Sequence, residues 1–189
     1  MHTPVAVYAM EKGMHVACEV PIARTIDEAW QLVETSEKTM KHCMMLENCC
    51  YDFFELLTLN LARQGFFGEI VHSEGAYIHG SNAYTSGKPL PYAYQWRLIQ
   101  IQGRPGNYYP THGLGPICQV MNINRGDKME YLSSMSTDDF SMSPMEKQLA
   151  ENDPFYAEWR NTKFRGNMNT TLVRTALGKT IMVQHAMDA

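Results

Sequence analysis

The segment YYPTHGLGP, Tyr108–Pro116, brings residue types that can do acid–base chemistry into a glycine-rich setting. The imidazole of His112 can accept a proton near neutral pH, and the phenol of Tyr109 can donate a hydrogen bond to an oxygen on which charge develops. The same residues also fit a structural role, in which His112 caps a helix that begins near Gly113 and the tyrosines belong to the core. Taken alone, the segment slightly favours the structural role.

Polar side chains also stand at the carboxyl ends of two predicted parallel strands. Glu19 lies near the end of the run HVACEVP, and Asn48 follows the run KHCMML. Ligands of α/β sheets bind beyond such ends, where an acid or an amide can hydrogen-bond a ribose or a carboxamide. Taken singly, each residue favours the simpler interpretation of a polar loop residue at a strand end. The phosphate-binding signature GxGxxG is missing from the sequence, because the nearest match, at Gly113 and Gly115, lacks the third glycine.

The other histidines and the cysteines have weaker claims to chemistry. Four histidines fall on predicted strands and are expected to be structural or at the surface: His15, His42, His72 and His185. His79 lies two residues after Tyr77, on the same strand face, and is a further candidate for lining the site. The five cysteines show no CxxC spacing, so we expect reduced and mostly buried thiols and no metal site.

Composition and charge argue against several classes of function. The 189 residues are 44% hydrophobic and 19% charged, which is typical of a soluble globular protein. The net charge of −4, without blocks of like charge, argues against nucleic acid or an anionic membrane as the main partner. No apolar run approaches the ~20 residues of a transmembrane helix, and no signal peptide opens the chain. The compartment stays open, with the cytoplasm as the default.

The first part of the chain alternates between helix and strand. Thr3 and the proline after it predict a helix start, and the run HVACEVP follows as a buried strand. Thr25 and Glu28 form a capping box for an amphipathic helix, KHCMML is a second strand, and an apolar helix ends at Gly65. This order predicts the C-terminal half of a doubly wound, Rossmann-type domain of the α/β class.

The rest of the chain has longer strand-like segments, so we divide the chain into domains 1–66 and 67–189. Strands are predicted within EIVHSEGAYIHG, YAYQWRLIQI, KMEYLSSMS, FRGNMNTTLVRT and KTIMVQHAM, with a hairpin turn at ALGK. Helices are expected from about Gly113 to Asn122 and at PFYAEW, whereas Ser136–Asn152 predicts a loop. The second domain is therefore expected to be α+β with a large, mainly antiparallel open sheet.

Four runs of the sequence resemble a known family. The runs EKGMHVACEVP, LENCCYDFFELLTLNLARQGFFGEIVHSEGAYIH, YYPTHGLGPICQVMNINRGDKMEYL and FRGNMNTTLVRT are similar to glycoside hydrolase family 109, and the resemblance extends from His2 to His185. These are NAD-dependent α-N-acetylgalactosaminidases of the Gfo/Idh/MocA oxidoreductase superfamily. The wider superfamily usually has a lysine where this sequence has Val20, between Glu19 and Pro21. That departure favours the glycosidase branch over a sugar dehydrogenase.

The resemblance implies where the cofactor and the sugar bind. The positions that match NAD contacts of the family are His2, Glu19, Val20 and Asn48. The positions that match substrate contacts are Tyr77, Arg97, Tyr109, Pro110, Thr111 and His112. In this interpretation His112 is the acid/base and Tyr109 its partner. Arg97 would position polar groups of the sugar, and Tyr77 would be a hydrogen-bonding or stacking contact.

The reaction that the resemblance implies is hydrolysis with retention of configuration. NAD transiently oxidises carbon 3 of the sugar, which acidifies the proton on carbon 2, and a base removes that proton. The glycosidic oxygen leaves, water adds to the unsaturated ketone, and carbon 3 is reduced again, so that NAD is regenerated in each turnover. The substrate implied is a terminal α-linked N-acetylgalactosamine, and the natural glycan stays open.

Relative to the family the chain is short at both ends. A glycine-rich turn before the first helix and a tyrosine-bearing segment after the last strand are not in this sequence. We therefore expect this chain alone to bind NAD poorly and to have little or no glycosidase activity. Two other functions stay open: a sugar oxidoreductase with net NADH turnover, and a non-catalytic fragment that contributes its sheet to an oligomer. A homo-oligomer formed through the open sheet is expected.

Overall fold

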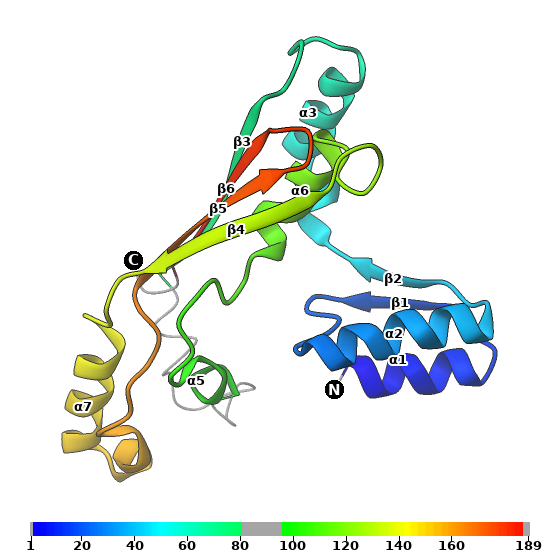
Figure 1. Ribbon diagram of the computed structural model, residues 1–189. Helices are drawn as coiled ribbons and strands as arrows, with labels where there is room; N and C mark the ends of the chain where they lie inside the picture. Colours follow the sequence, from blue (N-terminus) through cyan, green and yellow to red (C-terminus); the bar gives the residue numbers. More distant parts are fainter. Residues whose placement is uncertain (1, 81–95, 187–189) are drawn as a thin grey trace. The chain divides into compact units, whose positions relative to one another are not determined.

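The computed structural model describes residues 2–80 and 96–186, with the backbone alone for Trp96 and Arg97 (Figure 1). The chain forms two compact units, Met1–Leu56 and Leu57–Ala189. Both units combine helices with a sheet, as the alternating and the longer strand-like segments predict. Among the described helices, none combines the length and the apolar character needed to cross a membrane.

The first unit is a pair of parallel strands with two helices against them. Strands β1 (Val16–Glu19) and β2 (Cys43–Leu46) pair in parallel, as the sequence predicts. Helices α1 (His2–Glu11) and α2 (Ile26–Thr39) pack together beside these strands (Figure 1). Their apolar side chains enclose a small core made of Ala6, Val7, Met10 and Leu32. This arrangement places the carboxyl ends of both strands at one edge.

The two helices of this unit start in different ways. Helix α1 begins at His2, before the predicted cap at Thr3, and the buried Thr3 hydroxyl instead donates a hydrogen bond to the carbonyl of Ile22 at 2.9 Å. Helix α2 has the predicted cap, because the Thr25 hydroxyl oxygen accepts from the Glu28 N–H at 3.1 Å. The Glu28 carboxylate accepts from the N–H of Arg24 at 2.7 Å, one residue earlier than in a standard capping box.

The cap at Thr25 gives a testable contribution to stability. Replacement Thr25→Ala leaves the N–H of Glu28 without its acceptor, and we expect the free energy of unfolding to fall by about 1 kcal/mol. Urea denaturation followed by circular dichroism measures the change. Gln31→Ala, at an exposed position in the middle of α2, is the matched control and should stay within about 0.5 kcal/mol of the unmodified chain. Equal midpoints for both variants would contradict a stabilising cap.

The chain passes between the units within helix α3 (Phe53–Arg63), which follows the short helix η1 (Asn48–Tyr51). Gly65 ends this segment in the left-handed conformation with φ of 74°, as a glycine after a helix is expected to do.

The second unit is built on a mixed four-stranded sheet with the strand order β3-β6-β5-β4. Strand β3 (His72–Ile78) runs parallel to β6 (Thr180–Ala186), whereas β5 (Met168–Thr175) is antiparallel to both β6 and β4 (Met129–Ser136). The predicted hairpin turn joins β5 to β6. The sheet is therefore mainly antiparallel, as expected.

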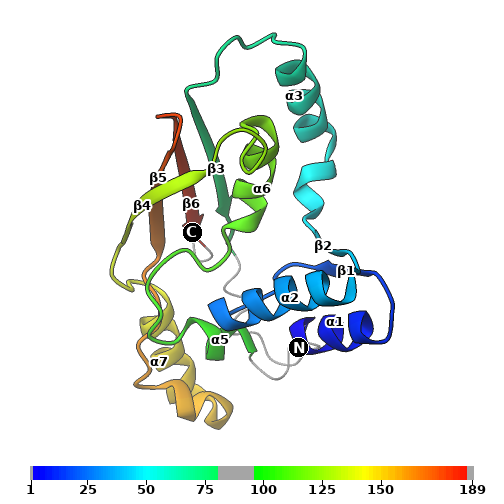
Figure 2. The same cartoon turned by 45° about the vertical axis from the view of Figure 1, so that its right-hand side comes forward.

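Helix α6 (Thr111–Val120) packs on one face of this sheet, against β3 (Figure 2). Its core consists of Ile117, Met121, Ile123, Val173, Ile181 and Val183. A second core joins helices α5 (Trp96–Ile101), α7 (Met142–Asn152) and η2 (Pro154–Trp159). η2 covers the predicted short helix at PFYAEW.

Two predictions for this unit were wrong. The described part of YAYQWRLIQI is helix α5, not a strand. Leu98 and Ile101, three residues apart, are both buried, which is helical spacing. The segment predicted as a loop contains α7, whose buried face is Met142, Glu146 and Ala150, at intervals of four. Its start is capped from outside the helix, because a carboxylate oxygen of Asp139 accepts from the N–H of Met142 at 3.0 Å.

Candidate active site

Tyrosine and histidine rings gather where β3 ends and α6 begins. The Tyr77 ring lies 5.2 Å from the Tyr109 ring and 5.0 Å from the His112 ring, measured between centroids. The Tyr109 and His112 rings are 4.8 Å apart, with 30° between their planes. His79 joins the group, 4.6 Å from Tyr77. We call these four residues the ring cluster.

Two glycines let α6 approach β3 closely enough to form the ring cluster. A Cβ atom on Gly75 would lie 2.6 Å from the carbonyl oxygen of Gly113, and a Cβ atom on Gly113 would lie 2.9 Å from the backbone nitrogen of Ala76. Side chains do not fit at these distances, so the contact needs glycine on both elements. Because Tyr77 is two residues after Gly75 and His112 precedes Gly113, this backbone contact brings the two rings together.

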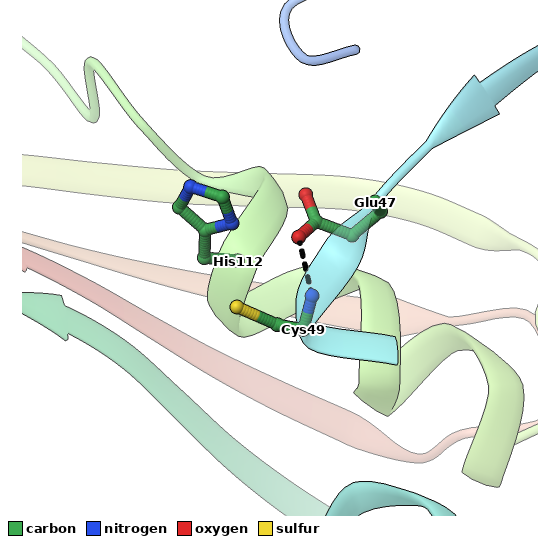
Figure 3. Close-up of side chains that lie close together, drawn as sticks. All are labelled: Glu47, Cys49 and His112. Atoms are coloured by element: carbon green, nitrogen blue, oxygen red, sulfur yellow. Dashed lines mark hydrogen bonds between the residues drawn. The ribbon is translucent and has the colours of Figure 1, made fainter. Parts of the chain in front are cut away.

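His112 lies inside the first turn of α6, as Figure 3 shows, and does not cap the helix. The N-cap residue is Pro110, which has no side-chain capping bond, so the capping role considered for His112 is not observed. The His112 and Tyr109 side chains are both half-buried. The preceding loop is held by a hydrogen bond from the Tyr109 N–H to Oδ1 of Asn107 at 3.1 Å. An imidazole between phenol rings, partly open to solvent, can exchange protons with a bound ligand.

Five of the six predicted substrate residues therefore lie on adjoining segments of one unit. Tyr77 comes from β3, and the other four run consecutively into α6: Tyr109, Pro110, Thr111 and His112. The sixth, Arg97, is on helix α5, and its side chain lies outside the described part of the chain.

A polar row crosses the sheet next to the ring cluster. Tyr77 on β3 pairs with His185 on β6, which pairs with Asn169 on β5, which pairs with Ser136 on β4. Residues paired in register project from the same face of a sheet. The Asn169 amide nitrogen donates to Oγ of Ser136 and of Ser134, both at 2.9 Å. The row therefore extends the site from the ring cluster into the sheet.

His185 was expected to be structural or at the surface, and its place beside Tyr77 was missed. It is fully buried, and its ring lies 5.9 Å from the Tyr77 ring with only 12° between the planes. The signal that could have found it is the alternation in β6, where Ile181, Val183 and His185 project to the same face and the first two are core residues. His185 is the polar exception among these three positions, and this exception is the signal that the sequence offers.

Burial and, secondly, the nearby Arg165 guanidinium lower the pKa of His185 to about 3. The unfolded chain binds a proton at this residue below its ordinary pKa of about 6.5, whereas the folded chain does not. Stability is therefore lost as the pH falls. Between about pH 7 and about pH 5 we expect a decrease of about 2 kcal/mol from this residue. Urea midpoints at several pH values measure it, and His185→Phe should remove this part of the pH dependence. An identical slope in the variant would contradict the assignment.

The predicted cofactor residues lie at the carboxyl edge of the two strands of the first unit. Nδ1 of His2 donates to the carbonyl of Pro21 at 2.7 Å, and Nε2 of His2 lies 3.6 Å from a carboxylate oxygen of Glu19. Val20 lies between Glu19 and Pro21 in the chain, and Asn48 follows β2, the neighbouring strand. The Glu19 and Asn48 side chains are exposed, so an acid and an amide are available to a ribose or a carboxamide.

A buried carboxylate lies beside Asn48. Oε1 of Glu47 accepts a hydrogen bond from the N–H of Cys49 at 3.1 Å (Figure 3). Burial, and then the charge of Glu47, raise the pKa of the Cys49 thiol to about 11. Burial also raises the thiol pKa of Cys18, Cys43 and Cys50.

These raised values predict slow thiol chemistry. At neutral pH a thiol of pKa about 11 has roughly one hundredth of the thiolate of one with pKa 9.0. In the folded chain, Cys49 should therefore react with a chromogenic disulfide at least about tenfold more slowly than it does in urea. The rate at Cys49 can be followed by mass spectrometry of the labelled peptides. A folded-state rate equal to that in urea would contradict the shift.

Comparisons with known proteins agree with this fold. The family model described as "Glycosyl hydrolase 109, C-terminal domain" matches residues 51–189. The chain is 51% identical over 187 residues to an "Alpha-N-acetylgalactosaminidase" of Bacteroides fragilis, covering 97% of this chain and 43% of that protein. It is 49% identical to "Glycosyl hydrolase family 109 protein 2" of Phocaeicola vulgatus, covering 97% of this chain and 45% of that protein. The chain thus spans less than half the length of these relatives.

Solved structures show the same fold at low sequence identity. An inositol dehydrogenase homologue from Azotobacter vinelandii, complexed with NAD+, matches 99% of this chain and 43% of its own, with 18% identity and a TM-score of 0.68. An NAD-binding oxidoreductase from Klebsiella pneumoniae matches 100% of this chain and 45% of its own, with 16% identity and a TM-score of 0.70. These matches show a Gfo/Idh/MocA-type fold. The family model, with the relatives of 51% and 49% identity, confirms the predicted resemblance: the chain belongs to glycosyl hydrolase family 109.

Proposed function

We propose that this chain provides the sugar-processing site of a retaining, NAD-dependent glycoside hydrolase that acts on terminal α-linked N-acetylgalactosamine. The observation that carries the proposal is the ring cluster, in which the centroids of the Tyr77, Tyr109 and His112 rings lie 4.8–5.2 Å from one another. The family model covers this segment, and a relative with 51% identity is named an α-N-acetylgalactosaminidase.

Proton transfer falls to His112 in this mechanism. Its half-buried ring would take the proton from carbon 2 of the bound sugar and return it after water has added. The phenol of Tyr109, whose ring is 4.8 Å from that of His112, would donate a hydrogen bond to the departing glycosidic oxygen. The ring of Tyr77 would orient the sugar against both groups.

The cofactor would be held by the first unit. Bound NAD would supply the oxidation of sugar carbon 3 and its reversal. The exposed Glu19 carboxylate and Asn48 amide, with His2 and Val20 beside Glu19, fit hydrogen bonding to its ribose and carboxamide. The described part of this unit has no GxGxxG turn, so these residues fit one end of the dinucleotide only.

Sugar binding and turnover test the proposal separately. N-acetylgalactosamine titrated into the chain should shift the ring resonances of Tyr77, Tyr109 and His112 in a saturable way. With a nitrophenyl α-N-acetylgalactosaminide, we expect slow release of nitrophenol that requires added NAD and leaves no net NADH. Steady growth of NADH absorbance with free sugar would instead support a sugar oxidoreductase. No binding and no NAD-dependent release would contradict the proposal.

A homo-oligomer is a second part of the proposal. The sheet face opposite to α6 exposes Ile78, Met135 and Leu172, which project to the same side of their strands. Light scattering should give a mass of at least two chains. Met135→Glu should reduce the mass to that of one chain, and a monomeric unmodified chain would contradict this part.

A further inference from the structure

His185 stands between two tyrosines of the candidate site. It is directly opposite Tyr77 in the parallel pairing of β3 and β6, with the two rings almost parallel. The Tyr108 ring meets it edge-on, with centroids 6.2 Å apart and 62° between the planes. Tyr108 immediately precedes Tyr109 of the ring cluster. The imidazole therefore contacts both segments that carry the cluster.

Hydrogen bonds do not orient this imidazole. Neither ring nitrogen of His185 has a hydrogen-bond partner in the described part of the chain, although the residue is fully buried. Its neighbour on β5, Asn169, uses its amide for other residues: the nitrogen donates to two serines, and the oxygen accepts from the hydroxyl of Thr171. The His185 ring is held instead by its contacts with the Tyr77 and Tyr108 rings, and it restrains these two rings in turn.

The ring also stays uncharged under ordinary conditions. Desolvation and Arg165 hold the pKa of His185 far below neutrality, and the Arg165 guanidinium donates to the carbonyl of Gly166 at 2.8 Å. The other titratable groups against the ring are the phenols of Tyr77 and Tyr108. A neutral, flat, buried ring can pack against a tyrosine ring and restrict its orientation.

We propose that His185 is a positioning residue, which holds the Tyr77 ring in the orientation that the sugar site needs. It contacts no substrate and acts through Tyr77. The proposal rests on the proposed function only in taking Tyr77 as a sugar contact. The packing of the two rings stands by itself.

Two substitutions separate the flat ring from its nitrogens. His185→Leu removes the ring, and His185→Phe keeps a flat ring and removes both unpaired nitrogens. The chain is labelled with ¹³C in its tyrosine rings, and the Tyr77 resonances are assigned as those missing from Tyr77→Phe. Ile181→Val, on the same face of β6 and in the core beneath α6, is the control for a small cavity that does not contact Tyr77.

The leucine variant should shift or broaden the Tyr77 ring resonances and raise the Kd for N-acetylgalactosamine by about tenfold or more. The phenylalanine variant should restore both, with a Tm equal to or above that of the unmodified chain, because no buried polar atom is left unpaired. The control should lower the Tm and leave the Tyr77 resonances and the Kd unchanged.

Unchanged Tyr77 resonances and Kd in the leucine variant would overturn the proposal. So would a phenylalanine variant that fails in the same way, because the nitrogens would then matter and not the ring. If the leucine variant does not fold, the phenylalanine variant decides: retained Tyr77 resonances and Kd support the proposal, and altered ones overturn it. The Tyr77 resonances are read without sugar or NAD. A chain that binds no sugar would therefore contradict the proposed function and leave the result for His185 standing.

Discussion

Replacement of His112 with glutamine is expected to lower kcat/KM for a nitrophenyl α-N-acetylgalactosaminide by about 10²–10⁴-fold relative to the unmodified chain. Glutamine can keep a hydrogen bond from this position, but it cannot accept a proton near neutral pH. The His112 ring is packed against the rings of Tyr77 and Tyr109 and partly open to solvent, so it is placed to reach a sugar in contact with both. Initial rates with NAD added in excess give the ratio.

His72→Gln is the matched control for this loss. His72 lies at the opposite end of β3 from Tyr77, is exposed, and its Nδ1 is 2.7 Å from the hydroxyl of Thr180. The control variant should keep kcat/KM within about twofold, since surface substitutions away from the site change little. Equal NAD-dependent rates for the His112 variant and the unmodified chain, both above the rate without protein, would remove His112 from the mechanism. Unchanged sugar affinity with a lost rate would place its role in proton transfer.

Gly113→Ala is expected to produce the second large effect, on both stability and activity. The added Cβ atom would lie 2.9 Å from backbone atoms of Ala76 and Gly75, which cannot rotate away as a side chain can. Helix α6 must therefore move from β3, at a cost of about 1–3 kcal/mol. A displacement of about 1 Å at His112 is expected to lower kcat/KM by about 10²-fold. Thermal unfolding and initial rates measure the two effects.

Gly75→Ala should reproduce both losses from the other side of the contact, where the Cβ atom would meet the Gly113 carbonyl oxygen. Ala76→Ser also adds one heavy atom to β3, but on the exposed face, and should leave Tm and rate unchanged. A Gly113 variant as stable and active as the control would show that the close approach of α6 to β3 does not position the site.

Local signals predicted much of the fold. Thr25 marked the start of α2 through its capping oxygen, and the short apolar runs before Glu19 and Asn48 marked the parallel strands. These features depend on neighbours within a few residues, so the sequence displays them directly. The hairpin between β5 and β6 is of the same kind.

The elements that were missed depend on contacts distant in the sequence. Helix α7 is polar and rich in methionine, and its start is stabilised by Asp139, which also accepts from the N–H of Phe164, 25 residues away. Helix α5 has only six residues, and burial of Leu98 and Ile101 against α7 and η2 decides its conformation. Short helices of this kind are set by tertiary packing, which no local pattern reports.

The same distinction holds for the site. Tyr109 and His112 could be singled out because they are close in the sequence and of reactive types. Their packing against Tyr77 depends on the contact between Gly75 and Gly113, two glycines 38 positions apart that resemble ordinary strand and helix residues in sequence. His185 joins the site only through the parallel pairing of β3 with β6, across more than 100 residues. Neither contact could be predicted before the strand order was known.

The central step of the proposed mechanism is removal of the carbon 2 proton of a bound N-acetylgalactosaminide by the ring cluster. Its most direct test is hydrolysis by this chain in deuterium oxide with NAD, followed by mass spectrometry and NMR of the released sugar. We predict deuterium at carbon 2 of the product, and no such exchange by the His112→Gln chain. A product released by the unmodified chain with its original hydrogen at carbon 2 would contradict the account.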